Sequence, residues 1–140
     1  MVQQGWEAFQ QRCRENIEYA SAVVRNTLST LPAGTSSATD YLDDDGNGAT
    51  HIPIRVTIAV TESGGITFDF TGSAPQVQGS LNATEAITRS ACYYVVRCLM
   101  EEEIPTNSGC NAPVTVIAPQ GTVVNALFPA AVAAGNVETS

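Results

Sequence analysis

The stretch Ile66-Thr67-Phe68-Asp69-Phe70-Thr71-Gly72-Ser73 decides the fold that we expect for this chain. Apolar and polar side chains alternate from residue 66 to residue 71, and this period of two predicts a β-strand with one buried face. The alternation stops at Gly72, and Pro75 follows shortly after. Because glycine and proline favour turns, the strand leads into a polar loop. Such a loop is a common position for a small-molecule site and an equally common end for an ordinary strand.

The neighbouring segments extend this strand into a sheet. Residues 51–61 alternate in the same way, and the turn-forming stretch Ser63-Gly64-Gly65 separates them from residues 66–71. This arrangement predicts a β-hairpin. Residues 37–43 and residues 114–118 predict two further short strands, so we expect one small antiparallel sheet.

Two segments show the period of an amphipathic helix. Apolar residues recur every three or four positions in residues 6–31, and the following Pro32 ends the pattern. Residues 85–102 predict a second helix, in which Asn82 and Glu85 resemble a capping box. The expected apolar stripe of this second helix consists of Ile87, Ala91, Tyr94, Val95, Cys98 and Leu99.

These elements together predict an α+β fold in which two amphipathic helices cover the apolar face of the sheet. The length of 140 residues fits a single domain. Within residues 1–140, we interpret residues 1–34 as a helical lead-in and residues 35–140 as the core of sheet and helix. For the first helix, packing in the core is favoured over binding a partner.

The composition excludes several classes of function. The net charge is −8 and all six cationic residues are arginine, so binding of nucleic acid through its phosphates is not expected. No apolar run approaches the ~20 residues of a membrane span, and the start lacks the pattern of a secretory signal. The four cysteines have no C-x-x-C spacing, which is typical of reduced thiols in a cytoplasmic protein. Charged residues make up only 14% of the chain, which suggests that another surface covers part of it.

The chemistry of a self-sufficient enzyme is missing from the sequence. His51 is the only histidine, and nothing near it completes a nucleophilic triad or a transition-metal site. The run Asp43-Asp44-Asp45-Gly46-Asn47-Gly48 matches the first half of a calcium loop, but the final ligand position falls on Ile54. We therefore interpret this run as a polar turn and expect no metal or cofactor in this segment. No phosphate-binding loop is present, since that motif requires lysine.

Several phrases in this order and spacing resemble the hydantoinase B/oxoprolinase family. They are Leu42-Asp43-Asp44-Asp45-Gly46, Phe68-Asp69-Phe70-Thr71-Gly72-Ser73, residues 76–82 around Gly79, Pro105-Thr106-Asn107-Ser108-Gly109, Ala118-Pro119-Gln120-Gly121-Thr122, and Pro129-Ala130-Ala131-Val132 with Gly135-Asn136. The members include N-methylhydantoinase B subunits, the C-terminal half of 5-oxoprolinase, and large subunits of acetone and acetophenone carboxylases. Since these proteins are several times longer, the resemblance implies that residues 1–140 are an internal segment of a B-type subunit.

The resemblance also implies a function for the parent protein. The parent would open a cyclic amide with ATP or would carboxylate a ketone, while the segment alone would be inactive. The expected partners are a hydantoinase A-type subunit and the rest of the B-type polypeptide itself. The resemblance implies that the parent complex uses ATP with Mg. It also allows a further divalent metal in the parent complex, outside this segment. As candidate substrate-binding residues, the polar positions that match family phrases are Asp69, Thr71, Ser73, Asn82, Asn107 and Asn136.

Overall fold

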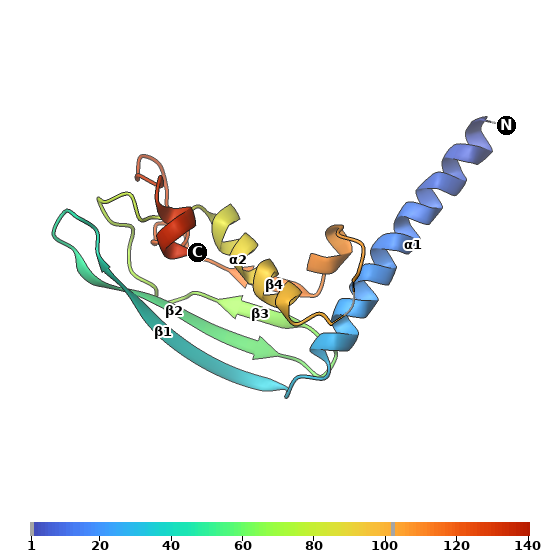
Figure 1. Cartoon of the computed structure of the whole chain (residues 1–140), viewed down its shortest axis with the longest axis horizontal. Helices are drawn as coiled ribbons and strands as arrows, with labels where there is room; N and C mark the ends of the chain where they lie inside the picture. The colour runs from blue at the N-terminus through green and yellow to red at the C-terminus, as the bar shows by residue number, and fades with distance from the viewer. Residues whose placement is uncertain (1, 102) are drawn as a thin grey trace.

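Figure 1 shows a four-stranded sheet with a helix lying over it and a longer helix projecting away from it. This computed structural model describes residues 2–101 and 103–140. The elements in chain order are α1 (Val2–Leu28), β1 (Gly34–Asp44), β2 (Thr50–Val60), β3 (Ile66–Asp69), α2 (Glu85–Cys98), the 3-10 helix η1 (Ser108–Asn111), β4 (Val114–Ile117) and the π-helical turn η2 (Gly135–Thr139). The predicted α+β class is confirmed.

The sheet is mixed, so the prediction of a purely antiparallel sheet was wrong in one pairing. The strand order is β1-β2-β3-β4, in which β1 with β2 and β2 with β3 are antiparallel. By contrast, β4 runs parallel to β3, with Ile66 opposite Val114 and Asp69 opposite Ile117. The reason lies in the connection, because the chain crosses through α2 between these two strands, and a helical crossover delivers a parallel strand. The short apolar pattern of residues 114–118 carries no information about strand direction.

The main hydrophobic core lies between α2, the end of α1 and the sheet. Its buried residues are Val24 and Leu28 from α1, Ile66 and Phe68 from β3, Cys92 and Val96 from α2, Ile104, and Val114 and Val116 from β4. A second cluster consists of Ile52, Ala74, Val123 and Val124, with Phe70 packed against both clusters. Each fully buried Val, Leu, Ile, Phe or Met side chain contributes about 1.5–3 kcal/mol, so both clusters stabilise the fold by burying apolar surface.

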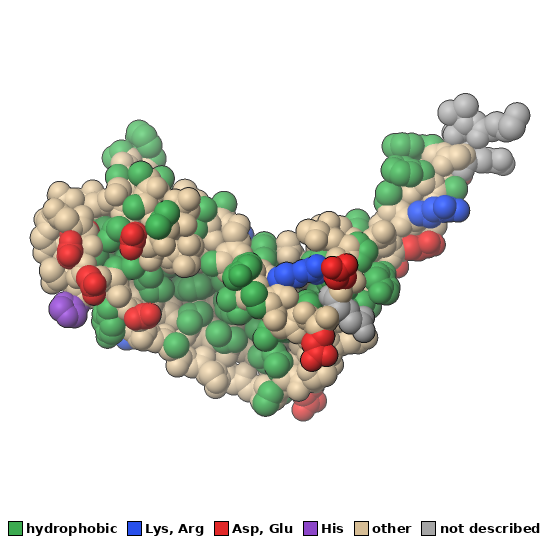
Figure 2. All heavy atoms as spheres, in the orientation of Figure 1, with side chains coloured by type: hydrophobic (Ala, Val, Ile, Leu, Met, Phe, Trp, Pro, Cys, Tyr) green, Lys and Arg blue, Asp and Glu red, His purple; other side chains and the backbone are tan. Residues whose placement is uncertain are grey.

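Only the C-terminal half of α1 joins this core. Figure 1 shows the other half projecting from the body, and Figure 2 shows hydrophobic side chains on its surface. Trp6 is 58% exposed and Phe9 is 56% exposed, and their rings stack with a centroid distance of 5.6 Å. The expectation of core packing for this helix therefore holds only from Ala20 onward, since residues 5–19 are all exposed.

The orientation of α2 differs from the sequence prediction by one position. Thr88, Cys92 and Val96 face the interior, whereas Tyr94 and Val95 of the predicted apolar stripe are exposed. Both faces of this helix are apolar, so the period of three to four cannot choose between them. The buried Thr88 satisfies its hydroxyl by donating to the carbonyl oxygen of Val124 at 2.6 Å. The predicted end at Glu102 lies outside the described residues.

Candidate functional site

The C-terminal end of β3 holds two of the candidate residues together. Asp69 is the last residue of the strand, and its carboxylate accepts the backbone N–H of Thr71 at 2.9 Å. Hydrogen bonds from the Thr71 hydroxyl and then from its backbone N–H hold the pKa of Asp69 below its ordinary value. Gly72 follows with a φ of 95°, a left-handed conformation that glycine adopts without strain. This corner therefore presents an ionised carboxylate beside an exposed threonine.

Ser73 is buried directly beyond this corner and bonds to the backbone of β2. Its hydroxyl accepts the N–H of Arg55 at 3.0 Å and donates to the carbonyl oxygen of Arg55 at 3.0 Å. Because β3 has already ended at Asp69, no strand is available to satisfy this part of β2. The Ser73 hydroxyl bonds to these backbone groups of β2 in place of a neighbouring strand. Both of these hydrogen bonds are internal to the fold.

Asn82 is fully buried and joins the loop of residues 77–79 to residue 131. Its Oδ1 accepts the N–H of Val77 at 2.8 Å, and its Nδ2 donates to the carbonyl oxygens of Val77, Gly79 and Ala131 at 2.9 to 3.0 Å. The capping box predicted for this residue was wrong, because the N-cap of α2 is Thr84 and makes no side-chain capping bond. The side-chain amide of Asn82 therefore forms its hydrogen bonds with backbone groups of the loops. Without these bonds, those backbone groups would be buried without partners.

Asn107 lies on a different part of the molecule, against the middle of α1. Its Oδ1 accepts the N–H of Gly109 at 2.8 Å and so caps η1. Its Nδ2 donates to the side chain of Asn16 at 3.0 Å and to the backbone carbonyl of the same residue at 3.3 Å. A Cβ atom added at Gly109 would lie 2.0 Å from the carbonyl oxygen of Ile17. The hydrogen bonds of Asn107 and the close packing of Gly109 therefore hold η1 against α1.

Asn136 is exposed on η2 and faces a groove beside α2. The groove has a volume of about 480 Å³. It is lined by Ile87, Ser90, Ala91, Tyr94, Val95, Asn136 and Ser140. The groove is mostly apolar, since it is formed largely by the exposed face of α2.

The fold thus brings Asp69 and Thr71 together and uses Ser73, Asn82 and Asn107 for internal bonds. Asn136 lies on a separate element, so the candidate residues do not line one cavity. A role in binding substrate stays a prediction for Asp69, Thr71 and Asn136, whose side chains are at least partly exposed.

Sequence reasoning missed the importance of Asp45. Its Oδ1 accepts the N–H groups of Asn47 at 2.8 Å and Ala49 at 2.9 Å, and its Oδ2 accepts that of Gly79 at 3.1 Å. The bond from the Asn47 N–H is the largest cause that lowers the pKa of Asp45, and burial opposes it. The carboxylate therefore organises the β1–β2 turn and fastens it to the loop around Gly79. The signal was the Asp-Gly-Asn-Gly run, which we interpreted only as a polar turn.

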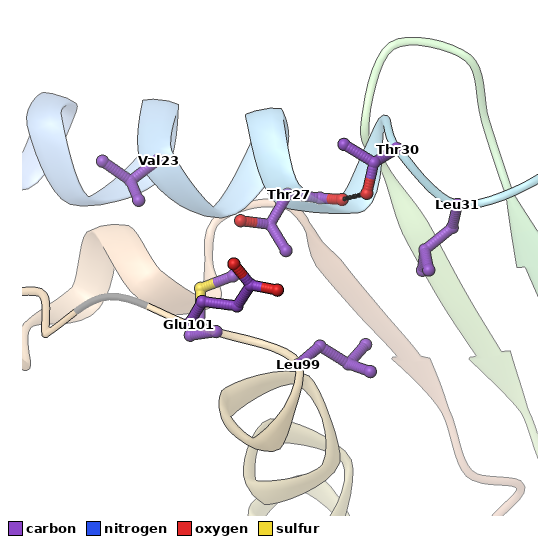
Figure 3. Close-up of a pocket in the computed structure, with 7 residues that line it drawn as sticks. Val23, Thr27, Thr30, Leu31, Leu99 and Glu101 are labelled. Carbon is purple, nitrogen blue, oxygen red and sulfur yellow. Dashed lines mark hydrogen bonds between the residues drawn. The ribbon is translucent and has the colours of Figure 1, made fainter.

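A separate cavity of about 280 Å³ lies where the end of α1 meets the end of α2. Figure 3 shows its apolar walls, with Thr27 and Glu101 pointing toward one another inside it. Thr30 closes the helix end by donating its hydroxyl to the carbonyl oxygen of Thr27 at 2.7 Å. None of the candidate residues from the sequence lines this cavity.

Within residues 2–101 and 103–140, no three His, Cys, Asp or Glu side chains come together as a metal site would require. Over the same residues, the helices are too short or too polar to cross a bilayer.

Comparison with known proteins places this chain in a family. All residues from 1 to 140 match the family model described as hydantoinase B/oxoprolinase. The chain is 40% identical over 109 residues to a 5-oxoprolinase of Dictyostelium discoideum. The matched region covers 78% of this chain and 8% of that protein. It is 31% identical over 140 residues to the B-type chain of a putative D-/L-hydantoinase from a Pseudomonas species, which covers 90% of this chain and 23% of that protein.

Two solved structures contain the same fold. An ATP-dependent caprolactamase from Pseudomonas jessenii superimposes with a TM-score of 0.79 at 26% identity, covering 99% of this chain and 24% of that one. A nucleotide-free acetone carboxylase superimposes with a TM-score of 0.73 at 17% identity, covering 93% of this chain and 19% of that one. The chain thus spans less than a quarter of each protein that it matches here. The match of every residue to one family model shows that this chain belongs to the hydantoinase B/oxoprolinase family.

Proposed function

We propose that this chain is a segment of a B-type subunit of an ATP-dependent enzyme that opens a cyclic amide ring of the 5-oxoproline or hydantoin class. The observation that carries the proposal is the 40% identity to a 5-oxoprolinase over 109 residues. The structural similarity to a caprolactamase supports it, because caprolactam is also a cyclic amide. The acetone carboxylase shares the fold at 17% identity, so a carboxylase parent is the weaker alternative.

The segment contributes a framework and a small number of accessible polar groups to this activity. Amide resonance stabilises the C–N bond of the ring, and ATP supplies the activation that opens it. The sequence has no lysine and no phosphate-binding loop, so we assign nucleotide with Mg, and any further divalent metal, to other parts of the parent complex. The A-type subunit, or a fused equivalent, is the proposed partner. On this segment, Asp69, Thr71 and Asn136 remain the candidates for contact with substrate.

A second candidate function is that of an interface module without chemistry of its own. The exposed aromatic side chains favour it, since Phe128 is 98% exposed and Trp6 is 58% exposed. Trp6 also stacks on the exposed Phe9, and contiguous exposed apolar side chains mark interaction surfaces. The two functions are compatible, because a segment of a catalytic subunit can also hold that subunit together.

The decisive experiment uses the longer polypeptide that contains these residues. We expect this polypeptide, mixed with its A-type subunit, to convert 5-oxoproline or hydantoin to the ring-opened acid only when ATP is present. Release of glutamate from 5-oxoproline and release of phosphate from ATP would be measured together. The 140-residue chain alone is expected to produce neither.

Matched substrates separate the alternatives. Carboxylation of acetone without any ring opening would replace the amidohydrolase proposal by the carboxylase alternative. ATP-dependent ring opening by the 140-residue chain alone would contradict the assignment of nucleotide chemistry to other parts of the complex. In an active parent complex, Asp69→Asn and Thr71→Ala should raise KM if these residues contact substrate, with Asp43→Asn on exposed β1 as a control.

A further inference from the structure

The turn between β1 and β2 contains the only asparagine of the chain that precedes a glycine, in the pair Asn47-Gly48. Both residues are exposed. Gly48 has a φ of 107°, a conformation that glycine adopts far more readily than a residue with a side chain. A Cβ atom added there would meet nothing within 4 Å. The backbone on either side of the Asn47–Gly48 bond therefore has open space around it.

The hydrogen bonds of this turn leave the backbone N–H of Gly48 unused. The N–H groups on either side of it, those of Asn47 and Ala49, donate to Oδ1 of Asp45 at 2.8 and 2.9 Å. Within the described part of the chain, the N–H of Gly48 has no acceptor. Breaking a hydrogen bond costs free energy. The Gly48 nitrogen can therefore lose its proton without that cost.

The side-chain amide of Asn47 is held more weakly than that of Asn107. Nδ2 of Asn47 donates to the backbone carbonyl of Asp45 at 3.2 Å, which is at the long end of the range for hydrogen bonds. No described residue donates to its Oδ1. By contrast, Asn107 is held at both ends, because its Oδ1 accepts the N–H of Gly109 and its Nδ2 donates to Asn16. The Asn47 amide is therefore the freer of the two to turn toward the next residue.

We propose that Asn47 is a site of spontaneous deamidation, in which the backbone nitrogen of Gly48 attacks the side-chain carbon Cγ of Asn47. The nitrogen gives its proton to water and bonds to Cγ, while Nδ2 takes a proton from water and leaves as ammonia. Water then opens the cyclic succinimide at either of its two carbonyl carbons, which gives aspartate or isoaspartate. The attack is intramolecular and water is the only co-reactant. The inference does not rest on the proposed function.

The products change the turn in two ways. Each of them adds a negative charge to a turn that already contains the aspartates at 43–45, and like charges repel each other. Isoaspartate also lengthens the backbone by one carbon between the N–H groups of Asn47 and Ala49, which share Oδ1 of Asp45. The other oxygen of this carboxylate accepts the N–H of Gly79 at 3.1 Å. Deamidation should therefore loosen the turn from the loop around Gly79.

The first test incubates the folded chain at mildly alkaline pH and follows each asparagine by peptide mass spectrometry, with ammonia release measured in parallel. We expect Asn47 to convert to aspartate and isoaspartate first, while Asn107 converts only when the chain is unfolded in urea. Asn47→Gln moves the amide carbon one methylene further from the Gly48 nitrogen, so the early release of ammonia should be lost. Asn26→Gln makes the same change on exposed α1, and it should leave that release unchanged.

Hydrogen exchange tests the effect on the turn. The amides of Ala49 and Gly79 should exchange faster in the deamidated chain than in the fresh chain, whereas the amides of β3 should keep their protection. Unchanged exchange at Gly79 after full conversion would overturn the predicted loosening.

The proposal itself has two outcomes that contradict it. One is a folded chain in which Asn107 converts as fast as Asn47, and the other is early ammonia release that Asn47→Gln leaves intact. These readouts follow the chemistry of one turn, so they are independent of the enzyme assays above.

Discussion

The two halves of α1 have the same sequence pattern and different surroundings. Apolar residues continue with spacings of three and four from Trp6 to Leu28. In the C-terminal half, Val24 and Leu28 are 0 to 1% exposed, whereas Trp6 and Phe9 in the N-terminal half are more than half exposed. An amphipathic pattern therefore specifies which face of a helix will be covered, but it does not specify what covers it.

The largest effect expected from this difference is on the free energy of unfolding. Leu28→Ala removes a fully buried side chain, so it should destabilise the chain by about 2–5 kcal/mol. Trp6→Ala is the matched substitution on the exposed half, and it should change stability by less than about 0.5 kcal/mol. Urea unfolding followed by circular dichroism measures both. Equal losses for the two variants would mean that the projecting half of α1 is covered in solution.

A second prediction concerns glycines instead of apolar side chains. A Cβ atom at Gly109 would lie 2.0 Å from the Ile17 carbonyl oxygen, whereas one at Gly5 on the projecting half meets nothing within 4 Å. Gly109→Ala should therefore destabilise the chain by about 1–3 kcal/mol. Gly5→Ala should stabilise it slightly, because alanine is the better helix former by about 0.5–1 kcal/mol. Thermal unfolding distinguishes the two signs, and a neutral Gly109→Ala would show that η1 does not pack closely on α1.

The smallest effect is expected for two aspartates that lie two positions apart. Asp45 is buried and accepts three backbone N–H groups, while Asp43 is exposed. Because folding lowers the pKa of Asp45 from its ordinary 3.8, its contribution to stability is present above about that pH. This contribution is lost as the pH falls through the lower pKa of the folded state.

The measurement is the free energy of unfolding between pH 7 and pH 2. Asp45→Asn should lower stability at pH 7 and flatten the decline at acidic pH. Asp43→Asn should leave both the value at pH 7 and the slope unchanged. A decline that Asp45→Asn leaves as steep as before would assign acid sensitivity to other carboxylates.

Much of the fold was predictable because the strand and helix patterns continue over many residues. The hairpin of β2 and β3, both helices and the α+β class follow from residues 6–118. The sequence did not predict which face of α2 points inward. The exposed Tyr94 and Val95 are also apolar, like the buried Cys92 and Val96. The direction of β4 depends on the crossover through α2, which strand propensity does not contain.

The candidate site was predictable only in part. Asp69 and Thr71 lie at a strand end, as the alternation up to residue 71 indicates. Ser73, Asn82 and Asn107 match the same kinds of polar phrase, yet each bonds to backbone that has no other partner. A buried loop needs such side chains as much as a binding site does. Residue type alone therefore does not separate the two uses.

The sequence by itself determined the elements of this protein, its family phrases and the absence of lysine, because these depend on local period and on residue identity. Only the tertiary structure decided which helix face is buried, how β4 runs and which polar side chains are already bonded. Those outcomes depend on contacts between residues far apart in the chain, such as Asp45 with Gly79 and Asn82 with Ala131. No local pattern contains such contacts.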